Sequence, residues 1–307
     1  MAKKIAVLLS GSGVFDGAEI HESVLTLLAL EEAGAEAVIA APSGPQMHVI
    51  NHLLGEVSEG ESRDILVEAA RIARGNITDL ASLDLDTIDG VVMPGGFGVA
   101  KNFCDFAVQG PACQVDSRIE DFLKMARSKG LPMGFACISP ALAAAVFKEG
   151  ILTLGSDQDP AAEGIRVLGA EHVACERDGI VCDQERKVVS TPAYMADTTL
   201  TALRLGLKRM VDQVMHWINE TEHEADLSTL EGWSVQGHKL VKEWTFDNDS
   251  QSIAWVNQVW QLAQEANHHP DLQLGYSTVK IELTTHDQSA LTDKDFQLAS
   301  MIDQAQQ

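Results

Sequence analysis

The fold of the first part of the chain is decided by a stretch that reads Leu131-Pro132-Met133-Gly134-Phe135-Ala136-Cys137-Ile138-Ser139-Pro140-Ala141. Residues 131–136 predict a strand and residues 139–146 predict a helix, which places Cys137 on the turn between them. Such a turn forces its central residue into a strained, exposed conformation, and the N-terminus of the following helix stabilises a thiolate. The same pattern also fits a small buried cysteine that does no chemistry, and spacing alone leaves both interpretations open.

Strands and helices alternate on either side of this turn. We predict strands at residues 5–9, 37–41 and 90–93, and helices at residues 20–33, 65–73 and 115–128. Short strands that alternate with helices indicate a parallel, flavodoxin-like sheet that is covered by helices on both faces. Ligands of such sheets collect at the carboxyl ends of the strands, where Pro94-Gly95-Gly96 can bring backbone N–H groups to a developing oxyanion.

The pattern changes near residue 220. Residues 219–226 are polar and predict a linker. Beyond them, the periodicity predicts strands at 239–246 and 277–283 and helices at 252–266 and 293–303. We therefore expect an α/β domain over residues 1–220 and a small α+β domain over residues 227–307, the latter with an antiparallel sheet and helices on one face.

Composition narrows the range of partners. The 307 residues carry 22 Lys and Arg against 45 Asp and Glu, a formal net charge of −23. This balance argues against nucleic acid and anionic membranes, because both require a basic surface. No apolar run reaches the length of a membrane span, and the first residues lack the features of a secretory signal, so we expect a cytoplasmic protein.

The sequence shows no pattern typical of a metal or nucleotide site. The five cysteines are odd in number and widely spaced, and no secretory signal is recognisable, which argues for reduced thiols. No pair has the C-x-x-C spacing of a metal site. Gly11-Ser12-Gly13 follows a predicted strand, but Asp16 stands where a dinucleotide-binding loop needs its third glycine. We therefore expect no cofactor.

Five stretches of the first part carry a family resemblance. They are Leu9-Ser10-Gly11-Ser12-Gly13-Val14-Phe15-Asp16-Gly17, Glu19-Ile20-His21-Glu22, Val91-Val92-Met93-Pro94-Gly95-Gly96-Phe97-Gly98, Gly134-Phe135-Ala136-Cys137-Ile138 and Thr191-Pro192-Ala193-Tyr194-Met195. With them, the first part resembles the PfpI and class I glutamine amidotransferase-like superfamily, and within it the ElbB type of glyoxalase-like proteins. The resemblance implies that Cys137 is the nucleophile, that Glu22 is the acid beside the thiol, and that Gly96 and Ile138 supply the oxyanion amides.

The chain departs from that superfamily at one position. Many members carry a histidine in a stretch for which this chain has Gly155-Ser156-Asp157-Gln158-Asp159-Pro160. Without that base, acyl transfer of the protease or amidase type is disfavoured. Addition of a thiolate to a small reactive aldehyde needs only a proton shuttle, which Glu22 can supply, so the resemblance favours glyoxalase-like chemistry on a small aldehyde.

Histidines cluster in the second part. The chain reads Gln264-Glu265-Ala266-Asn267-His268-His269-Pro270, and His286 follows the predicted strand at 277–283. Pro270 ends the preceding helix and restricts His269. Three imidazoles at one place can donate and accept protons near neutral pH. A surface histidine pair without a partner would show the same spacing, whereas a shared metal ion is disfavoured because adjacent residues point in different directions.

The spacings of the second part are very specific. Residues 227–307 resemble pterin-4a-carbinolamine dehydratase, also known as the dimerisation cofactor type. The residues that carry the resemblance are Gly232-Trp233, His268-His269-Pro270, Tyr276, His286 and Leu291-Thr292-Asp293-Lys294-Asp295-Phe296-Gln297-Leu298-Ala299. Gln264 departs from the family, which often has a charged residue four positions before the first histidine.

The resemblance implies dehydration of a 4a-hydroxytetrahydropterin to the quinonoid dihydropterin. His269 is then the base, His268 and His286 are acids or orienting groups, and Trp233, Pro270 and Asp295 contact the pterin. We expect a homo-oligomer, because members of this family assemble through helices. Two alternatives stay open: aldehyde conversion by Cys137 is the main activity, or the second domain is a non-catalytic dimerisation module.

Overall fold

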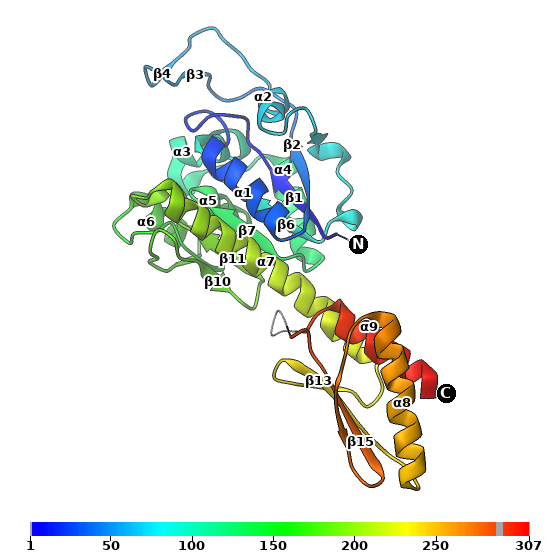
Figure 1. The fold of residues 1–307 in the computed structure, drawn as a ribbon. Coiled ribbons are helices and arrows are strands. Elements are labelled where there is room, and N and C mark those ends of the chain that lie inside the picture. Colours follow the sequence, from blue (N-terminus) through cyan, green and yellow to red (C-terminus); the bar gives the residue numbers. More distant parts are fainter. Residues whose placement is uncertain (1, 287–290, 307) are drawn as a thin grey trace. The chain divides into compact units, whose positions relative to one another are not determined.

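The computed structural model describes residues 2–286 and 291–306 of the chain. The chain divides into two compact units, Met1–Ile218 and Asn219–Gln307, which we call unit 1 and unit 2 (Figure 1). Each unit has its own apolar core. Within the described ranges, no helix combines the length and the apolar character needed to cross a membrane.

Unit 1 is built on a seven-stranded sheet with the order β10-β11-β7-β6-β1-β2-β5. The strands are β1 (Lys4–Leu8), β2 (Glu36–Ala41), β5 (Thr78–Asp79), β6 (Gly90–Met93), β7 (Met133–Ala136), β10 (Val181–Asp183) and β11 (Val188–Thr191). All neighbours are parallel except the edge pair β10 and β11. The predicted flavodoxin-like, parallel-dominated sheet is therefore confirmed.

Helices cover this sheet, as Figure 1 shows. They are α1 (Ile20–Glu32), α2 (Ile65–Ile72), α3 (Phe106–Gln109), α4 (Ser117–Ser128), α5 (Ser139–Phe147), α6 (Pro160–Val167) and α7 (Leu200–Thr229). Burial on both faces explains why the central strands are continuous apolar runs. Every residue of β6 and β7 is buried. Two short pairs lie outside the main sheet, β3 (Ile50–Asn51) with β4 (Glu56–Val57) and β8 (Ile151–Leu152) with β9 (Glu171–His172).

The predicted linker is wrong. Residues 219–226 are helical, because α7 continues through them to Thr229. Buried Leu207, Val211 and Val214 show that the first part of α7 carries an apolar stripe at helical spacing. The polar segment that follows contains no glycine or proline, so nothing in it stops the helix.

Unit 2 pairs an antiparallel sheet with two long helices. Its sheet has the order β12-β13-β15-β14, and its elements are β12 (Ser234–Gln236), β13 (Lys239–Thr245), α8 (Asp249–Ala266), β14 (Asp271–Leu274), β15 (Thr278–Leu283) and α9 (Asp293–Gln306). In β15, Val279, Ile281 and Leu283 are buried, whereas the alternate residues are partly exposed. The helices therefore cover one face of the sheet, as predicted.

The core of unit 2 also uses residues that lie before residue 227. The His223 ring stacks on Phe296, with ring centroids 4.5 Å apart, and His223 Nε2 lies 3.8 Å from Asp293 Oδ1. The end of α7 therefore contributes to the packing of unit 2.

We predict that fragments 1–218 and 219–307 each fold, because each keeps a complete core. Fragment 227–307 should melt about 5 °C below fragment 219–307, since it loses the contacts of His223. Thermal melting followed by circular dichroism checks both statements. Equal melting temperatures of the two shorter fragments would show that the end of α7 adds nothing to unit 2.

Candidate active sites

Cys137 lies on a tight turn between β7 and α5. Its φ of 59° falls in the left-handed region, which costs free energy in a residue other than glycine. The backbone N–H of Cys137 donates to Thr191 O over 3.0 Å. The Ser139 hydroxyl lies 2.9 Å from Met93 O and 2.7 Å from Ala136 O. These contacts to neighbouring strands hold the strained turn that the sequence predicts.

Glu22 is the carboxylate of this site. It lies in the first turn of α1 and is fully buried. Its Oε2 accepts the N–H of Gly95 over 2.8 Å, its Oε1 accepts the N–H of Tyr194 over 3.3 Å, and its side chain hydrogen-bonds Cys137. Burial, assisted by the negative charge of Glu19, raises the pKa of Glu22 to about 7. Glu22 can therefore both take and release a proton near neutral pH.

The sulfur of Cys137 is less acidic than the sequence led us to expect. Cys137 is 8% exposed, and burial together with the charge of Glu22 raises the pKa of its thiol well above the usual value. The backbone N–H groups of Gly96 and Ile138 point at this sulfur and oppose that shift. The expected exposed position is wrong because Cys137 is buried, and burial together with the charge of Glu22 keeps the pKa of its thiol above the usual value.

Glycines shape the wall of this site. A Cβ on Gly95 would lie 2.4 Å from Cys137 Cβ and 2.9 Å from Glu22 Oε2. Gly96 has a φ of 99°, and a Cβ there would lie 2.4 Å from the backbone of Gly17. Only glycine at both positions lets the loop after β6 come so close to the thiol and the carboxylate.

Two further polar side chains belong to this site. His21 Nδ1 lies 2.8 Å from the Tyr194 hydroxyl and 3.9 Å from Glu19 Oε1. Burial and the charges of Glu19 and Glu22 raise the pKa of Tyr194. Both residues stand in the motifs quoted above, but sequence reasoning gave them no role. The available signal is the position of Tyr194, three residues after the end of β11.

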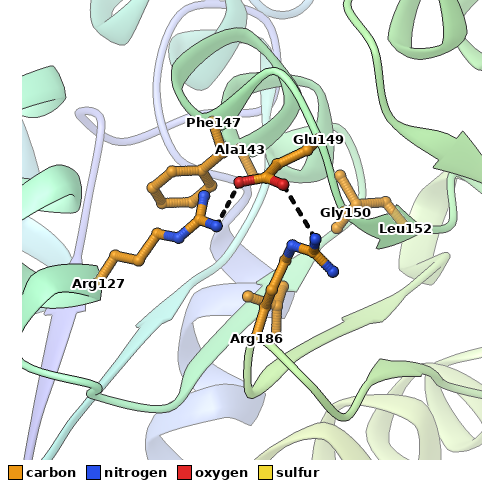
Figure 2. A pocket seen from close by; sticks show the side chains of 8 residues that line it. Arg127, Ala143, Phe147, Glu149, Gly150, Leu152 and Arg186 are labelled. Carbon is orange, nitrogen blue, oxygen red and sulfur yellow. Dashed lines mark hydrogen bonds and ion pairs between the residues drawn. The ribbon is translucent and has the colours of Figure 1, made fainter.

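A pocket elsewhere in unit 1 is lined by none of these residues. There, Glu149 lies between the guanidinium groups of Arg127 and Arg186, as Figure 2 shows. Arg186 also lies 3.4 Å from Asp183 Oδ2, and Arg127 packs 4.9 Å from the centre of the Phe147 ring. Because the carboxylates balance both cations, we interpret this network as a structural one.

Asp295 organises the candidate site of unit 2. It is fully buried in the first turn of α9, where its Oδ2 accepts the backbone N–H of Thr292 over 2.8 Å, as in a capping box. The same oxygen accepts the Thr285 hydroxyl over 2.9 Å. Its Oδ1 lies 2.7 Å from His268 Nε2. One carboxylate therefore connects the loop after α8, the loop after β15 and the start of α9.

His268 is fixed by this carboxylate. Asn267 ends α8 in the left-handed conformation, with a φ of 49°, which turns the chain toward Asp295. An ionised carboxylate only accepts hydrogen bonds, so Nε2 of His268 carries a proton. In the neutral ring, the lone pair is then on Nδ1. His268 is thus held in one orientation and, when neutral, in one tautomer.

The other two histidines are exposed. The ring centroid of His269 lies 5.3 Å from that of Trp260, and both side chains face solvent. The side chain of His286 is 62% exposed, and its Nε2 lies 3.7 Å from Asp271 Oδ2. Because Asp271 begins the strand that follows His268 and His269, the three imidazoles lie at the same end of the sheet.

The remaining predicted residues take different places. Pro270 is buried beside His269. Trp233 is 7% exposed in the core, where its Nε1 donates to Asp303 Oδ1 over 3.1 Å and its ring meets Trp244 edge-on. These contacts give Trp233 a packing role, and its contact with a pterin stays a prediction. Gln264 and Glu265 are both exposed at the end of α8.

Comparison with known proteins separates the same two parts. Residues 216–305 match the family model of pterin 4 alpha carbinolamine dehydratase. A protein of Nostoc sp., provisionally named pterin-4-alpha-carbinolamine dehydratase, is 40% identical over 87 residues, which are 28% of this chain and 94% of that protein. The human glutamine amidotransferase-like class 1 domain-containing protein 3 is 46% identical over 222 residues, which are 70% of this chain and 83% of that protein.

A solved structure extends the comparison of the first part. It is an isoprenoid biosynthesis protein with an amidotransferase-like domain from Ehrlichia chaffeensis. It is 33% identical, has a TM-score of 0.65, and the match covers 70% of this chain and 99% of that one. This likeness agrees with the ElbB type recognised in the sequence.

One expectation from the sequence is overturned by these relatives. The human protein is named as mitochondrial, and so are matched ES1 proteins of Rattus norvegicus and Danio rerio. The predicted cytoplasmic location is therefore wrong.

The fold and the relatives divide the chain in the same way. Unit 1 has the parallel-dominated sheet that its sequence predicts, and unit 2 has the predicted antiparallel sheet with helices on one face. The chain belongs to the glutamine amidotransferase-like class 1 family through its first 220 residues or so, and to the pterin-4-alpha-carbinolamine dehydratase family through residues 216–305.

Proposed function

We propose that unit 2 dehydrates a 4a-hydroxytetrahydropterin to the quinonoid dihydropterin and water. The observation that carries this proposal is the pairing of His268 with Asp295 next to two exposed imidazoles. One ring is held in a fixed orientation, and the other two are open to a small molecule. Membership of the dehydratase family supports the same reaction.

The reaction moves two protons. A base removes the proton from a ring nitrogen of the pterin, and an acid protonates the hydroxyl at C4a. The C–O bond then breaks, water leaves, and the electron pair of the nitrogen forms the new C=N bond. No electrons are exchanged with the protein, so histidine side chains near neutral pH are sufficient.

The exposed and buried histidines fit different parts of this reaction. We propose His269 as the base, because its ring is accessible and is flanked by the flat surface of Trp260. His268 serves as the oriented acid or hydrogen-bonding group, since Asp295 sets its direction. His286 completes the set from the opposite loop, which the Thr285–Asp295 hydrogen bond ties to His268.

We expect His269→Ala to lower pterin dehydration by about 10²–10⁴-fold, the usual contribution of a positioned acid or base. His269→Ala combined with His286→Ala should approach the uncatalysed rate. His268→Ala, Asp295→Asn and their double variant should show nearly equal losses, because the two groups act as one unit. Stopped-flow dehydration of the 4a-hydroxypterin measures these rates in the full chain.

Cys137→Ala is the matched control and should dehydrate the pterin at the parent rate. Circular dichroism verifies that each histidine variant is folded. A folded His269→Ala/His286→Ala double variant with the parent rate would refute the assignment. Unit 2 would then be a binding or dimerisation module.

We further propose that unit 2 joins copies of the chain through α8. Ile253, Val256 and Trp260 lie on one face of this helix at positions i, i+3 and i+7, and Ile253 and Trp260 are 49% and 46% exposed. An apolar stripe of this kind on a helix surface is typical of a helix–helix interface.

Ile253→Glu should therefore reduce the oligomer to a smaller species without unfolding it. Light scattering coupled to size exclusion measures the mass, and Val167→Glu, at an exposed apolar position of unit 1, is the control. An unchanged mass for Ile253→Glu would exclude this face as the interface.

For unit 1 we propose addition of the Cys137 thiol to a small aldehyde such as glyoxal. The observation that favours it is the hydrogen bond between Cys137 and a carboxyl group whose pKa is about 7. As the sulfur attacks the carbonyl carbon, Glu22 takes the thiol proton and the carbonyl oxygen becomes an oxyanion. The N–H groups of Gly96 and Ile138 lie beside the sulfur, where they can stabilise that charge.

This role of Glu22 predicts a pH dependence. Only the ionised carboxylate can accept the thiol proton, so the rate of aldehyde consumption should rise as pH passes through about 7 and fall below it. Cys137→Ala should abolish the reaction. Glu22→Gln should lower the rate and remove the titration near pH 7.

Loss of glyoxal, followed at several pH values, measures this profile. His269→Ala is the control and should keep the parent profile. A Glu22→Gln variant with the same midpoint as the parent would show that another group is the base.

A further inference from the structure

A pair of cysteines lies in unit 1, in the segment between Val99–Phe103, a π-helical turn, and α4. Residues 103–105 run antiparallel to residues 114–116, and Cys104 stands opposite Val115. Hydrogen bonds on both sides fix this register, Asp116 N to Phe103 O over 2.8 Å and Asp105 N to Gln114 O over 3.2 Å. Cys113, two residues before Val115, is therefore a diagonal neighbour of Cys104 on the same face.

The two thiols interact electrostatically, and they differ in environment. The Cys104 thiol donates to Val99 O over 3.4 Å. Cys104 is 5% exposed, and its interaction with Cys113 together with burial raises the pKa of its thiol. Cys113 is partly exposed. The interaction with Cys104, assisted by the positive charge of Lys148, lowers the pKa of Cys113 to about 7.

This arrangement distinguishes Cys113 from the other cysteines. Burial raises the pKa of the Cys175 and Cys182 thiols, and burial together with Glu22 raises that of Cys137. At neutral pH, Cys113 is therefore the thiol with the largest thiolate fraction. It also has a second thiol, that of Cys104, as its diagonal neighbour across the paired segments, as a cysteine with a resolving partner does.

We propose that Cys104 and Cys113 form a reversible intramolecular disulfide when the protein meets a peroxide. The Cys113 thiolate attacks the O–O bond of hydrogen peroxide, which gives a sulfenic acid on Cys113 and releases hydroxide. The sulfur of Cys104 then attacks the sulfur of Cys113, the S–O bond breaks, and the leaving hydroxide takes the Cys104 proton as water. Both sulfurs are oxidised by one electron each, and the peroxide is reduced to one water and one hydroxide. This hydroxide becomes the second water when it takes up the proton that Cys113 released on ionisation.

This modification site is separate from the chemistry proposed for Cys137 and for unit 2. Neither Cys104 nor Cys113 contacts Cys137 or Glu22 through a described hydrogen bond. Formation of the disulfide can therefore succeed or fail whatever the outcome of the activity measurements.

Mass spectrometry of the full chain tests the proposal directly. Both cysteines lie in one tryptic peptide, residues 102–118, because no lysine or arginine separates them. The reduced protein is treated with one equivalent of hydrogen peroxide, quenched with catalase, denatured, and alkylated with iodoacetamide before digestion. We expect peptide 102–118 without alkyl groups and lighter by two hydrogens than its reduced form, and dithiothreitol should restore double alkylation.

Variants identify the roles of the two thiols. In the Cys113→Ser variant, Cys104 should remain a free thiol during the peroxide treatment and should therefore be fully alkylated afterwards. In Cys104→Ser, Cys113 should be trapped as a sulfenic acid by dimedone. Cys182→Ser is the matched control and should form the same disulfide as the parent. Brief alkylation of the native protein at pH 6 to 8 should label Cys113 first, with a midpoint near pH 7.

Three results would overturn the proposal. The first is that peptide 102–118 is still doubly alkylated although the peroxide has been consumed by the oxidation of other residues. The second is a disulfide that joins Cys104 or Cys113 to a different cysteine or to a second chain on a non-reducing gel. The third is a Cys113→Ser variant, folded by circular dichroism, that protects Cys104 as the parent does.

Discussion

A carboxylate that is taken out of water must be given hydrogen-bond donors, and this constraint shapes both units. Glu22 receives the N–H groups of Gly95 and Tyr194, which lie 73 and 172 residues away in sequence. Asp295 accepts hydrogen bonds from the Thr292 N–H and the Thr285 hydroxyl, and it lies within hydrogen-bond distance of His268 Nε2. In each unit, one buried acid therefore holds together loops that the sheet alone would leave independent, and these loops carry the candidate chemistry.

Glu22 and Asp295 have different properties because their hydrogen-bond partners differ. Glu22 has only two backbone donors and a nearby like charge, so part of its desolvation is uncompensated and it holds its proton up to about pH 7. That property suits a group that exchanges a proton with Cys137. Asp295 faces an imidazole, a hydroxyl and a backbone N–H, and its role is to set the direction of His268. A proton shuttle and an orienting group thus follow from the same constraint.

The sequence predicts the parts of this molecule that depend on local pattern. Apolar periodicity places α1, and the run before Cys137 places the strained turn correctly. The prediction of a linker at 219–226 is wrong, since this segment is polar but contains no helix-breaking residue. The acidity of Cys137 was misjudged for another reason: burial and the contact with Glu22 depend on distant segments, and no local pattern encodes them. The contact between His21 and Tyr194, 173 residues apart, escaped for the same reason.

The raised pKa of Glu22 also connects function with stability. An ordinary glutamate has a pKa of 4.5, so the unfolded chain ionises this group more easily than the folded one. The protonated Glu22 side chain makes its full contribution to stability below pH 4.5. This contribution is lost as pH rises through about 7, because the folded protein must then hold a charged carboxylate in a site without water. A difference of this size corresponds to about 3 kcal/mol. The strained φ of Cys137 and the two glycines, Gly95 and Gly96, lower the stability of unit 1 further. The site at the carboxyl ends of the strands, where the thiol, the carboxylate and the backbone amides meet, therefore lowers the stability of unit 1. The large buried core of this unit compensates for the loss.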